Sequence, residues 1–139
     1  MVLAKWLYLA ILAQVAIPIW VLLLNAKRKN ADRKAGNVSE NAPIDNKAWS
    51  LPVLLTSNSL ANQFQLPILF YVLCFMFIQL EHVSMLVIGL SWWFVITRWI
   101  HAIVHVNTNH IPHRFGSFLL GALGLLILFV YAVCVVVQL

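Results

Sequence analysis

Four long apolar stretches, separated by short polar segments, dominate the pattern of hydrophobic and polar positions along the chain. They predict membrane-spanning helices at about residues 3–25, 55–80, 82–106 and 114–138, because about 20 mostly apolar residues are needed to cross a bilayer. A very short turn at Glu81–His82 makes the second and third spans an antiparallel hairpin. The length of 139 residues leaves room only for these spans and short connections. The sequence therefore predicts one all-α domain, an integral membrane four-helix bundle.

Individual residues within this pattern predict local features. The polar residues 30–49 predict an exposed loop. Gln14, in the middle of the first span, is expected to form a hydrogen bond between helices, and Pro67 is expected to bend the second span. Gly121 and Gly124 predict a close helix contact in the fourth span, which is otherwise expected to be purely structural.

Basic residues are distributed unevenly between the two sides of the predicted membrane. Residues 27–47 contain six Lys and Arg, the connection that starts at Arg98 and ends at Arg114 adds two, and the opposite side has only Lys5. Because Lys and Arg accumulate on the cytoplasmic side, both termini are predicted to lie outside. The basic segment contains no aromatic residue before Trp49, so it does not have the interleaved pattern of a nucleic-acid-binding surface.

Two ladders of polar side chains interrupt the apolar pattern near the cytoplasmic side. Within each ladder the residues are three or four positions apart, which places them on one helical face. The ladders consist of Asn58, Asn62 and Gln65 in the second span, and of Arg98, His101 and His105 in the third. A guanidinium near the membrane centre costs ~2.5–3.5 kcal/mol on insertion scales, unless the side chain reaches the interface. We therefore expect the two ladders to meet in one site at the cytoplasmic end of the bundle.

The five histidines raise the question of a metal site. The spacings HAIVH and HIPH superficially resemble the paired histidines of membrane di-iron hydroxylases, but such sites need more histidines and supporting carboxylates. The only acid next to a predicted span is Glu81, at the opposite end, and His82 is also at that end, away from a haem-binding position. No metal site is predicted within one chain, and no carboxylate lies inside a span to serve a proton-coupled exporter.

Two sequence blocks, ANQFQLPILFYVLC at residues 61–74 and RWIHAIVHVNTNHIPHR at residues 98–114, resemble segments of one known family. This family is MAPEG, the membrane-associated proteins in eicosanoid and glutathione metabolism, and the resemblance is closest to its prokaryotic members. Residues 61–74, ANQFQLPILFYVLC, resemble the family's second-helix segment, in which an Asn is followed three residues later by an acid. Residues 98–114, RWIHAIVHVNTNHIPHR, resemble the third-helix block, which has an Arg, a His, an aromatic or His, and a closing Arg at the start of the fourth span. The four-span layout and the basic first loop extend the resemblance over nearly the whole chain.

The resemblance implies a homotrimer that binds glutathione as a co-substrate between neighbouring protomers, near the cytoplasmic face of a bacterial inner membrane. By position, the glutathione-binding residues would be Arg28, Asn62, Gln65, Arg98, His101 and His105, and the catalytic residue would be Arg114. A guanidinium beside a thiol favours the thiolate. That thiolate would attack a small lipophilic substrate arriving from the membrane lipid.

Two positions depart from the glutathione-using members of the family. Asn58 stands where they carry an Arg, and Gln65 stands where they carry an acid. Two functions therefore remain open on the sequence. One is a glutathione S-transferase or peroxidase acting on hydrophobic electrophiles or lipid hydroperoxides. The other is a non-enzymatic trimeric membrane protein that binds another anionic or lipid-like ligand in the same pocket.

Overall fold

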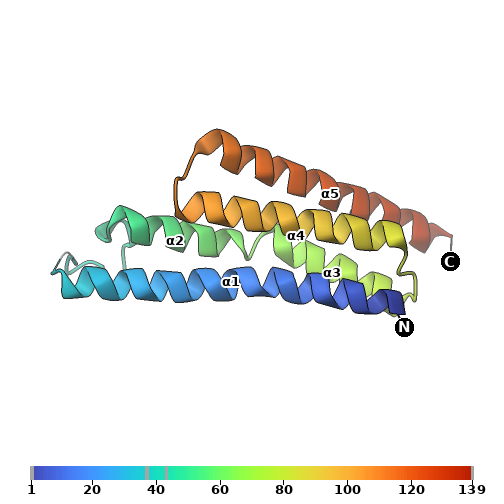
Figure 1. The fold of residues 1–139 in the computed structure, drawn as a ribbon, viewed down its shortest axis with the longest axis horizontal. Helices are drawn as coiled ribbons and strands as arrows, with labels where there is room; N and C mark the ends of the chain where they lie inside the picture. The colour runs from blue at the N-terminus through green and yellow to red at the C-terminus, as the bar shows by residue number, and fades with distance from the viewer. Residues whose placement is uncertain (1, 37, 43, 139) are drawn as a thin grey trace.

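The computed structural model describes residues 2–36, 38–42 and 44–138, which are helical throughout apart from their connections and contain no β-strand. The helices are α1 (Val2–Lys34), η1 (Asn46–Ala48), α2 (Leu51–Asn62), α3 (Leu66–Gln79), α4 (Met85–Val106) and α5 (Ile111–Val137). By length and composition, α1, the pair α2 and α3, α4 and α5 are each apolar enough to cross a membrane. The predicted all-α membrane bundle with four spans is confirmed (Figure 1).

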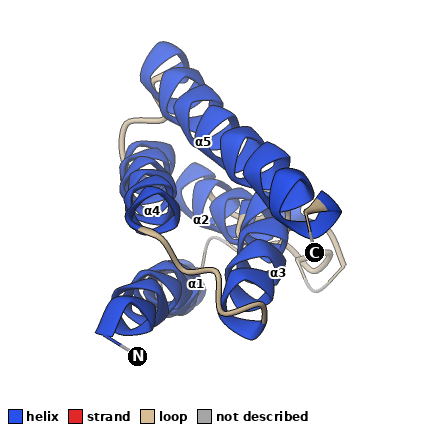
Figure 2. Ribbon diagram, turned by 90° about the vertical axis from the view of Figure 1, so that its right-hand side faces the viewer, coloured by secondary structure: helices blue, strands red, loops and turns tan. Residues whose placement is uncertain are grey.

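Helix α4 is the central element of the bundle. It packs against α5, α1, α2 and α3, and Figure 2 shows α5 and α1 on opposite sides of it. Phe94 and Val95 of α4 are buried in an apolar core with Leu7 of α1, Phe70 of α3 and Leu128 of α5. The rings of Phe70 and Phe94 are stacked with centroids 4.7 Å apart. This core fixes the rotation of α4 and therefore the direction in which its polar side chains point.

Large apolar side chains also cover the outside of the bundle. Leu23 of α1, Val72 of α3, Ile96 of α4 and Phe129 of α5 are all more than half exposed. Apolar surface left in water costs about 25 cal/mol per Å² relative to an apolar environment. Lipid is the solvent that this surface matches.

Helix α1 continues beyond the predicted first span. The span was predicted at residues 3–25 and a polar loop was expected to follow soon after, whereas the helix ends at Lys34. The residues that extend it are mostly Ala, Lys and Arg, which are strong helix formers. Arg33 and Lys34 occupy the last turn, where cations interact favourably with the helix dipole. Gly36 then adopts a φ of 70°, a left-handed conformation that commonly terminates helices.

The second span consists of two helices rather than one bent helix. Between α2 and α3, Gln65 has φ −110° and ψ −106°, which is not helical. Pro67 lies in the first turn of α3. In a continuous helix its ring would clash with the carbonyl of Gln63, four residues earlier. The break removes Gln65 from the helical face of Asn58 and Asn62, so the predicted ladder on one helix is correct only for these two.

The connections at the two ends of α4 are both tight turns. Between α3 and α4, Glu81 has a φ of 54°, and Ser84 Oγ then caps α4 by accepting a hydrogen bond from the Val87 N–H at 3.3 Å. This is the predicted antiparallel hairpin. At the other end, Asn109 has a φ of 48° and α5 begins at Ile111, slightly before the predicted fourth span.

Helices α4 and α5 approach each other closely at two glycines of α5. A Cβ atom at Gly121 would lie 2.8 Å from Thr97 Oγ1, and one at Gly124 would lie 2.7 Å from Trp93 Cδ1. Both separations are shorter than the 3.4–4 Å of ordinary van der Waals contact. The close helix contact predicted at these glycines is therefore confirmed.

The hydrogen bond predicted for Gln14 is absent from the described part of the chain. Its side chain is fully buried, and neither its amide nitrogen nor its amide oxygen has a hydrogen-bond partner there. Ala10 and Ile17, its buried neighbours on the same face of α1, are apolar. That prediction was wrong, because an amide gains a bond only if the facing helix offers a polar group.

Candidate functional site

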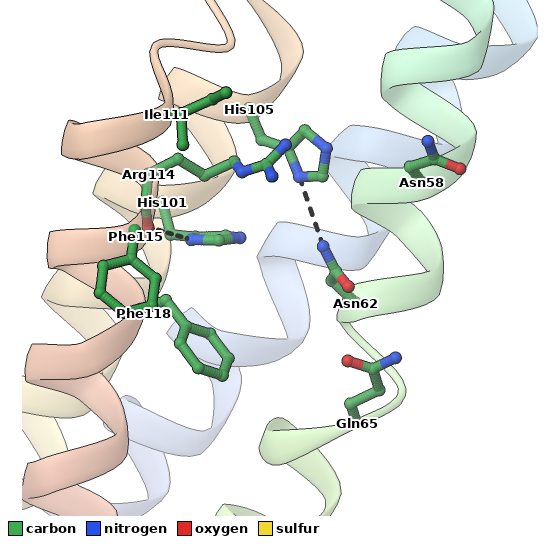
Figure 3. Close-up of a pocket in the computed structure, with 9 residues that line it drawn as sticks. All are labelled: Asn58, Asn62, Gln65, His101, His105, Ile111, Arg114, Phe115 and Phe118. Carbon is green, nitrogen blue, oxygen red and sulfur yellow. Dashed lines mark hydrogen bonds between the residues drawn. The ribbon is translucent and has the colours of Figure 1, made fainter.

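A cavity of about 460 Å³ lies where α2, α4 and α5 meet. Figure 3 shows amide groups of α2 and the α2–α3 break on one side, and α5 on the other, with two histidines of α4 between them. Its lining residues are Asn58, Asn62, Gln65, His101, His105, Ile111, Arg114, Phe115 and Phe118. Apart from Arg98, all residues of the two predicted ladders face this one cavity.

Two histidines of α4 connect its neighbouring helices across the cavity. His105 Nδ1 lies 3.4 Å from Asn62 Nδ2 of α2, and His101 Nδ1 lies 2.9 Å from the carbonyl oxygen of Arg114 of α5. An amide nitrogen only donates, so His105 Nδ1 accepts; a carbonyl oxygen only accepts, so His101 Nδ1 donates. These two contacts hold both rings in place, and His101 Nε2 has no partner within the described residues.

Arg114 supplies the positive charge on the cavity wall. It lies in the first turn of α5, and its Nη1 donates a hydrogen bond to Asn109 Oδ1 at 2.6 Å. Figure 3 shows the guanidinium extending from α5 towards the ring of His105. The guanidinium is thus held by an uncharged amide in the α4–α5 turn. Its other N–H groups remain available to an anionic ligand.

Arg98, predicted to bind ligand, lies behind the cavity wall. Its side chain is 1% exposed and does not line the cavity. Its Nη2 donates to the backbone oxygen of Asn62 at 3.4 Å, the last residue of α2, where the carbonyl groups lack helical partners and carry partial negative charge. Its Nε has no hydrogen-bond partner among the described residues. In the single chain, Arg98 therefore supports the end of α2 and makes no direct contact with the cavity.

Arg28, the other predicted binding residue, is also outside the cavity in the single chain. Its Nη1 donates to the backbone oxygens of Pro52 and Val106, each at 3.0 Å. The side chain thereby ties the extension of α1 to the start of α2 and to the end of α4. A direct role in binding would require the ligand of a neighbouring protomer to approach it.

A sequence profile of the MAPEG family matches residues 4–134, nearly the whole chain. The chain belongs to the MAPEG family. Comparisons with curated proteins and with solved structures give no match. The resemblance seen in residues 61–74 and 98–114 is therefore confirmed, and the four apolar helices make this MAPEG chain an integral membrane protein. The family is generally associated with glutathione and is generally trimeric.

The apolar wall of the cavity in this MAPEG protein was not predicted from the sequence. Ile111, Phe115 and Phe118 of α5 line it, and the ring of Phe118 lies 6.0 Å from that of His101 between centroids. One signal was present in the sequence: Phe118 follows Arg114 by four positions and Ile111 precedes it by three, which places both beside it on the helix surface. The cavity thus has an apolar wall facing a polar one.

The polar groups of the cavity are suited to hydrogen bonding with an organic anion. Among residues 2–36, 38–42 and 44–138, no group of three or more His, Cys, Asp or Glu is placed to hold a metal ion. The rings of His101 and His105 are 5.7 Å apart between centroids and nearly perpendicular. Each already bonds a protein group through Nδ1.

Proposed function

We propose that this MAPEG protein is a membrane-bound glutathione S-transferase or peroxidase that acts on hydrophobic electrophiles or lipid hydroperoxides. The observation that carries the proposal is the position of Arg114, a guanidinium on a cavity otherwise lined by amide, imidazole and apolar side chains. A guanidinium beside a thiol favours the thiolate, which is the nucleophilic form. The general association of the family with glutathione supports this choice of thiol.

In this proposal the carboxylates of glutathione accept hydrogen bonds from the cavity wall. Arg114 and the amide groups of Asn58 and Asn62 are the donors on the wall. Hydrogen bonds to charged groups contribute ~1.5–3 kcal/mol each. The wall comes from only three helices of one chain, and we propose that a neighbouring protomer of a homotrimer closes the remaining side and brings Arg28 to the ligand.

A second cavity supports the proposal that the co-substrate is lipophilic. It has a volume of about 480 Å³, lies between α3 and α5, and is lined only by apolar side chains, among them Leu66, Ala122 and Phe129. Lining residues of the two cavities lie close together along the chain: Gln65 and Leu66 are consecutive, and Phe118 and Ala122 are one helical turn apart. A hydrophobic electrophile or lipid hydroperoxide entering from the bilayer would meet the thiolate near this boundary.

The enzyme proposal is tested with the purified protein in detergent. Conjugation of glutathione to an aryl halide and reduction of a lipid hydroperoxide should both be measurable, and Arg114→Ala should lower kcat/KM by at least about tenfold. Lys47→Ala, which removes a cation from the exposed η1 segment, should leave both rates unchanged. Glutathione at a hundred times its Kd should stabilise the fold by ~2.7 kcal/mol. A wild-type protein that neither turns over nor gains stability with glutathione would refute the proposal.

The second candidate is a non-enzymatic trimeric membrane protein that binds another anionic or lipid-like ligand. Asn58 and Gln65 favour it, because both line the cavity and neither carries a charge. Its signature would be anion binding by the wild-type protein, lost in Arg114→Ala, with no conjugation and no hydroperoxide reduction.

We also propose that the cavity lies on the cytoplasmic side of a bacterial inner membrane, with both termini outside. The six Lys and Arg of residues 27–47 support this orientation. They lie in the extension of α1 and in the segment that leads to α2. Within that extension, Arg28 donates a hydrogen bond to the backbone oxygen of Val106, at the end of α4 beside the cavity.

A further inference from the structure

Three arginines surround the cavity end of the bundle, and each is hydrogen-bonded to uncharged groups. Arg28 donates to two backbone oxygens at 3.0 Å, Arg98 to the backbone oxygen of Asn62 at 3.4 Å, and Arg114 to Asn109 Oδ1 at 2.6 Å. Arg98 is almost completely removed from water. The partners of these guanidinium groups are dipoles that bear no full negative charge, so this end of the bundle has a strongly positive potential.

None of the acidic residues of the chain lines the cavity. The sequence has four Asp and Glu, and Glu81 is in the α3–α4 turn, at the far end of α4 from the cavity. Asp32 and Asp45 each accept a hydrogen bond from a backbone N–H in the segment that leads to α2, and Glu40 is exposed in the same segment.

Building on the proposed function, we infer that the cavity discriminates against an ammonium group, so that it binds a thiol with two anionic groups and no ammonium group more tightly than it binds glutathione. An anionic group gains Coulomb energy from Arg114 on the wall and from Arg98 behind it, and this attraction is strong where water is excluded. An ammonium group is repelled by both guanidinium groups. It meets amide oxygens such as that of Gln65, which accept a hydrogen bond but carry no charge to neutralise it. Glutathione has two carboxylates and one ammonium, so the same tripeptide without its amine fits the cavity better.

A matched pair of ligands isolates this effect. Glutathione and glutaryl-cysteinylglycine differ only in the amino group, and isothermal titration calorimetry on the wild-type protein in detergent measures both Kd values. The glutaryl peptide is expected to bind at least about tenfold more tightly. Equal affinities, or tighter binding of glutathione, would overturn the inference.

A substitution on the cavity wall tests the stated cause. Gln65 is exposed in the single chain and lines the cavity, so Gln65→Glu adds a carboxylate there with little change in shape. The variant should reverse the order and bind glutathione more tightly than the glutaryl peptide. Asn46→Asp adds the same charge in the exposed η1 segment and should keep the wild-type order. If Gln65→Glu keeps the wild-type order too, the inference is wrong.

Failure of the proposed function gives a different result. If neither tripeptide binds, glutathione is not the co-substrate and the proposed function fails. The inference is then tested alone with glutarate and glutamate, which differ by the same amino group, through their effect on thermal stability. Greater stabilisation by glutarate supports a cavity for anions without an amine, whereas equal or absent stabilisation overturns it.

Discussion

Gly121 lets α5 approach α4 beside Arg98, and its replacement by alanine is expected to destabilise the bundle. The added Cβ would lie 2.8 Å from Thr97 Oγ1, well inside ordinary contact distance. Either the helices separate or Thr97 changes rotamer. Thr97 is only 5% exposed and its Oγ1 donates a hydrogen bond to the Phe94 carbonyl at 2.7 Å, so a rotamer change breaks this bond.

The expected size of the effect follows from these contacts. Overpacking a well-packed interior costs ~1–3 kcal/mol, and loss of one hydrogen bond costs about 1 kcal/mol. The higher helix propensity of alanine offsets about 1 kcal/mol. Gly89→Ala is the control, because Gly89 is exposed on α4 and a Cβ there would have no heavy atom within 4 Å. The free energy of unfolding of Gly121→Ala should therefore be ~1–3 kcal/mol below that of Gly89→Ala.

Unfolding by SDS in mixed micelles, followed by circular dichroism, measures these differences. The decisive comparison repeats Gly121→Ala in a Thr97→Ala background. There the Oγ1 atom is gone and the nearest remaining atom of residue 97 would be its Cβ, at an acceptable 3.6 Å. The cost of Gly121→Ala should fall by about 1 kcal/mol or more in that background. An unchanged cost, or a Gly121→Ala protein as stable as Gly89→Ala, would show that this contact does not limit the packing.

Three further outcomes are expected. Gln14→Met should raise the free energy of unfolding by ~1–3 kcal/mol, because it removes a buried amide without partners from an apolar face; no gain in the SDS titration would mean that the amide is bonded in the assembled protein. In a protein whose exposed Cys134 is replaced by serine, single cysteines introduced at Ser39 and at His82 should be labelled from opposite sides of the membrane in intact cells. Labelling of both from one side would contradict the proposed orientation. Native mass spectrometry in mild detergent should show mainly trimers, and a spectrum of monomers or dimers would count against the proposed protomer-boundary site.

Most of the fold could be predicted because a bilayer imposes a strong condition on the sequence. Each span needs about 20 apolar residues, and that signal located all four. The apolar signal carries no information about a helix that continues beyond the membrane into water. The extension of α1 to Lys34 was therefore missed, although its Ala, Lys and Arg residues favour a helix. Pro67 located the discontinuity in the second span, but whether a proline bends or breaks a helix depends on the backbone conformation of the residues before it.

The site was predictable where spacing was informative. Asn62, His101 and His105 line the cavity as the spacing of polar residues indicated. Spacing places a residue on one face of a helix but does not show how deeply the side chain is buried. The burial of Arg98 behind the cavity wall could therefore not be predicted, although His101 and His105 on the same face line the cavity. Phe118, like the other apolar lining residues of α5, was missed because an apolar residue in an apolar span has no contrast with its surroundings, and only its spacing from Arg114 could have indicated it.

The break before Pro67 and the buried guanidinium of Arg98 form one arrangement in the structure. Because α2 stops before Pro67, its last carbonyl groups lose their helical partners. The Gln63 side chain donates to the Ser59 carbonyl at 3.1 Å, and Arg98 donates to the Asn62 carbonyl at 3.4 Å. The break thus provides acceptors with partial negative charge for a cation that would otherwise be costly inside a membrane. The same contact holds Asn62, whose amide then reaches a histidine on the cavity wall, so the proline that interrupts the span also determines where the cavity's polar groups lie.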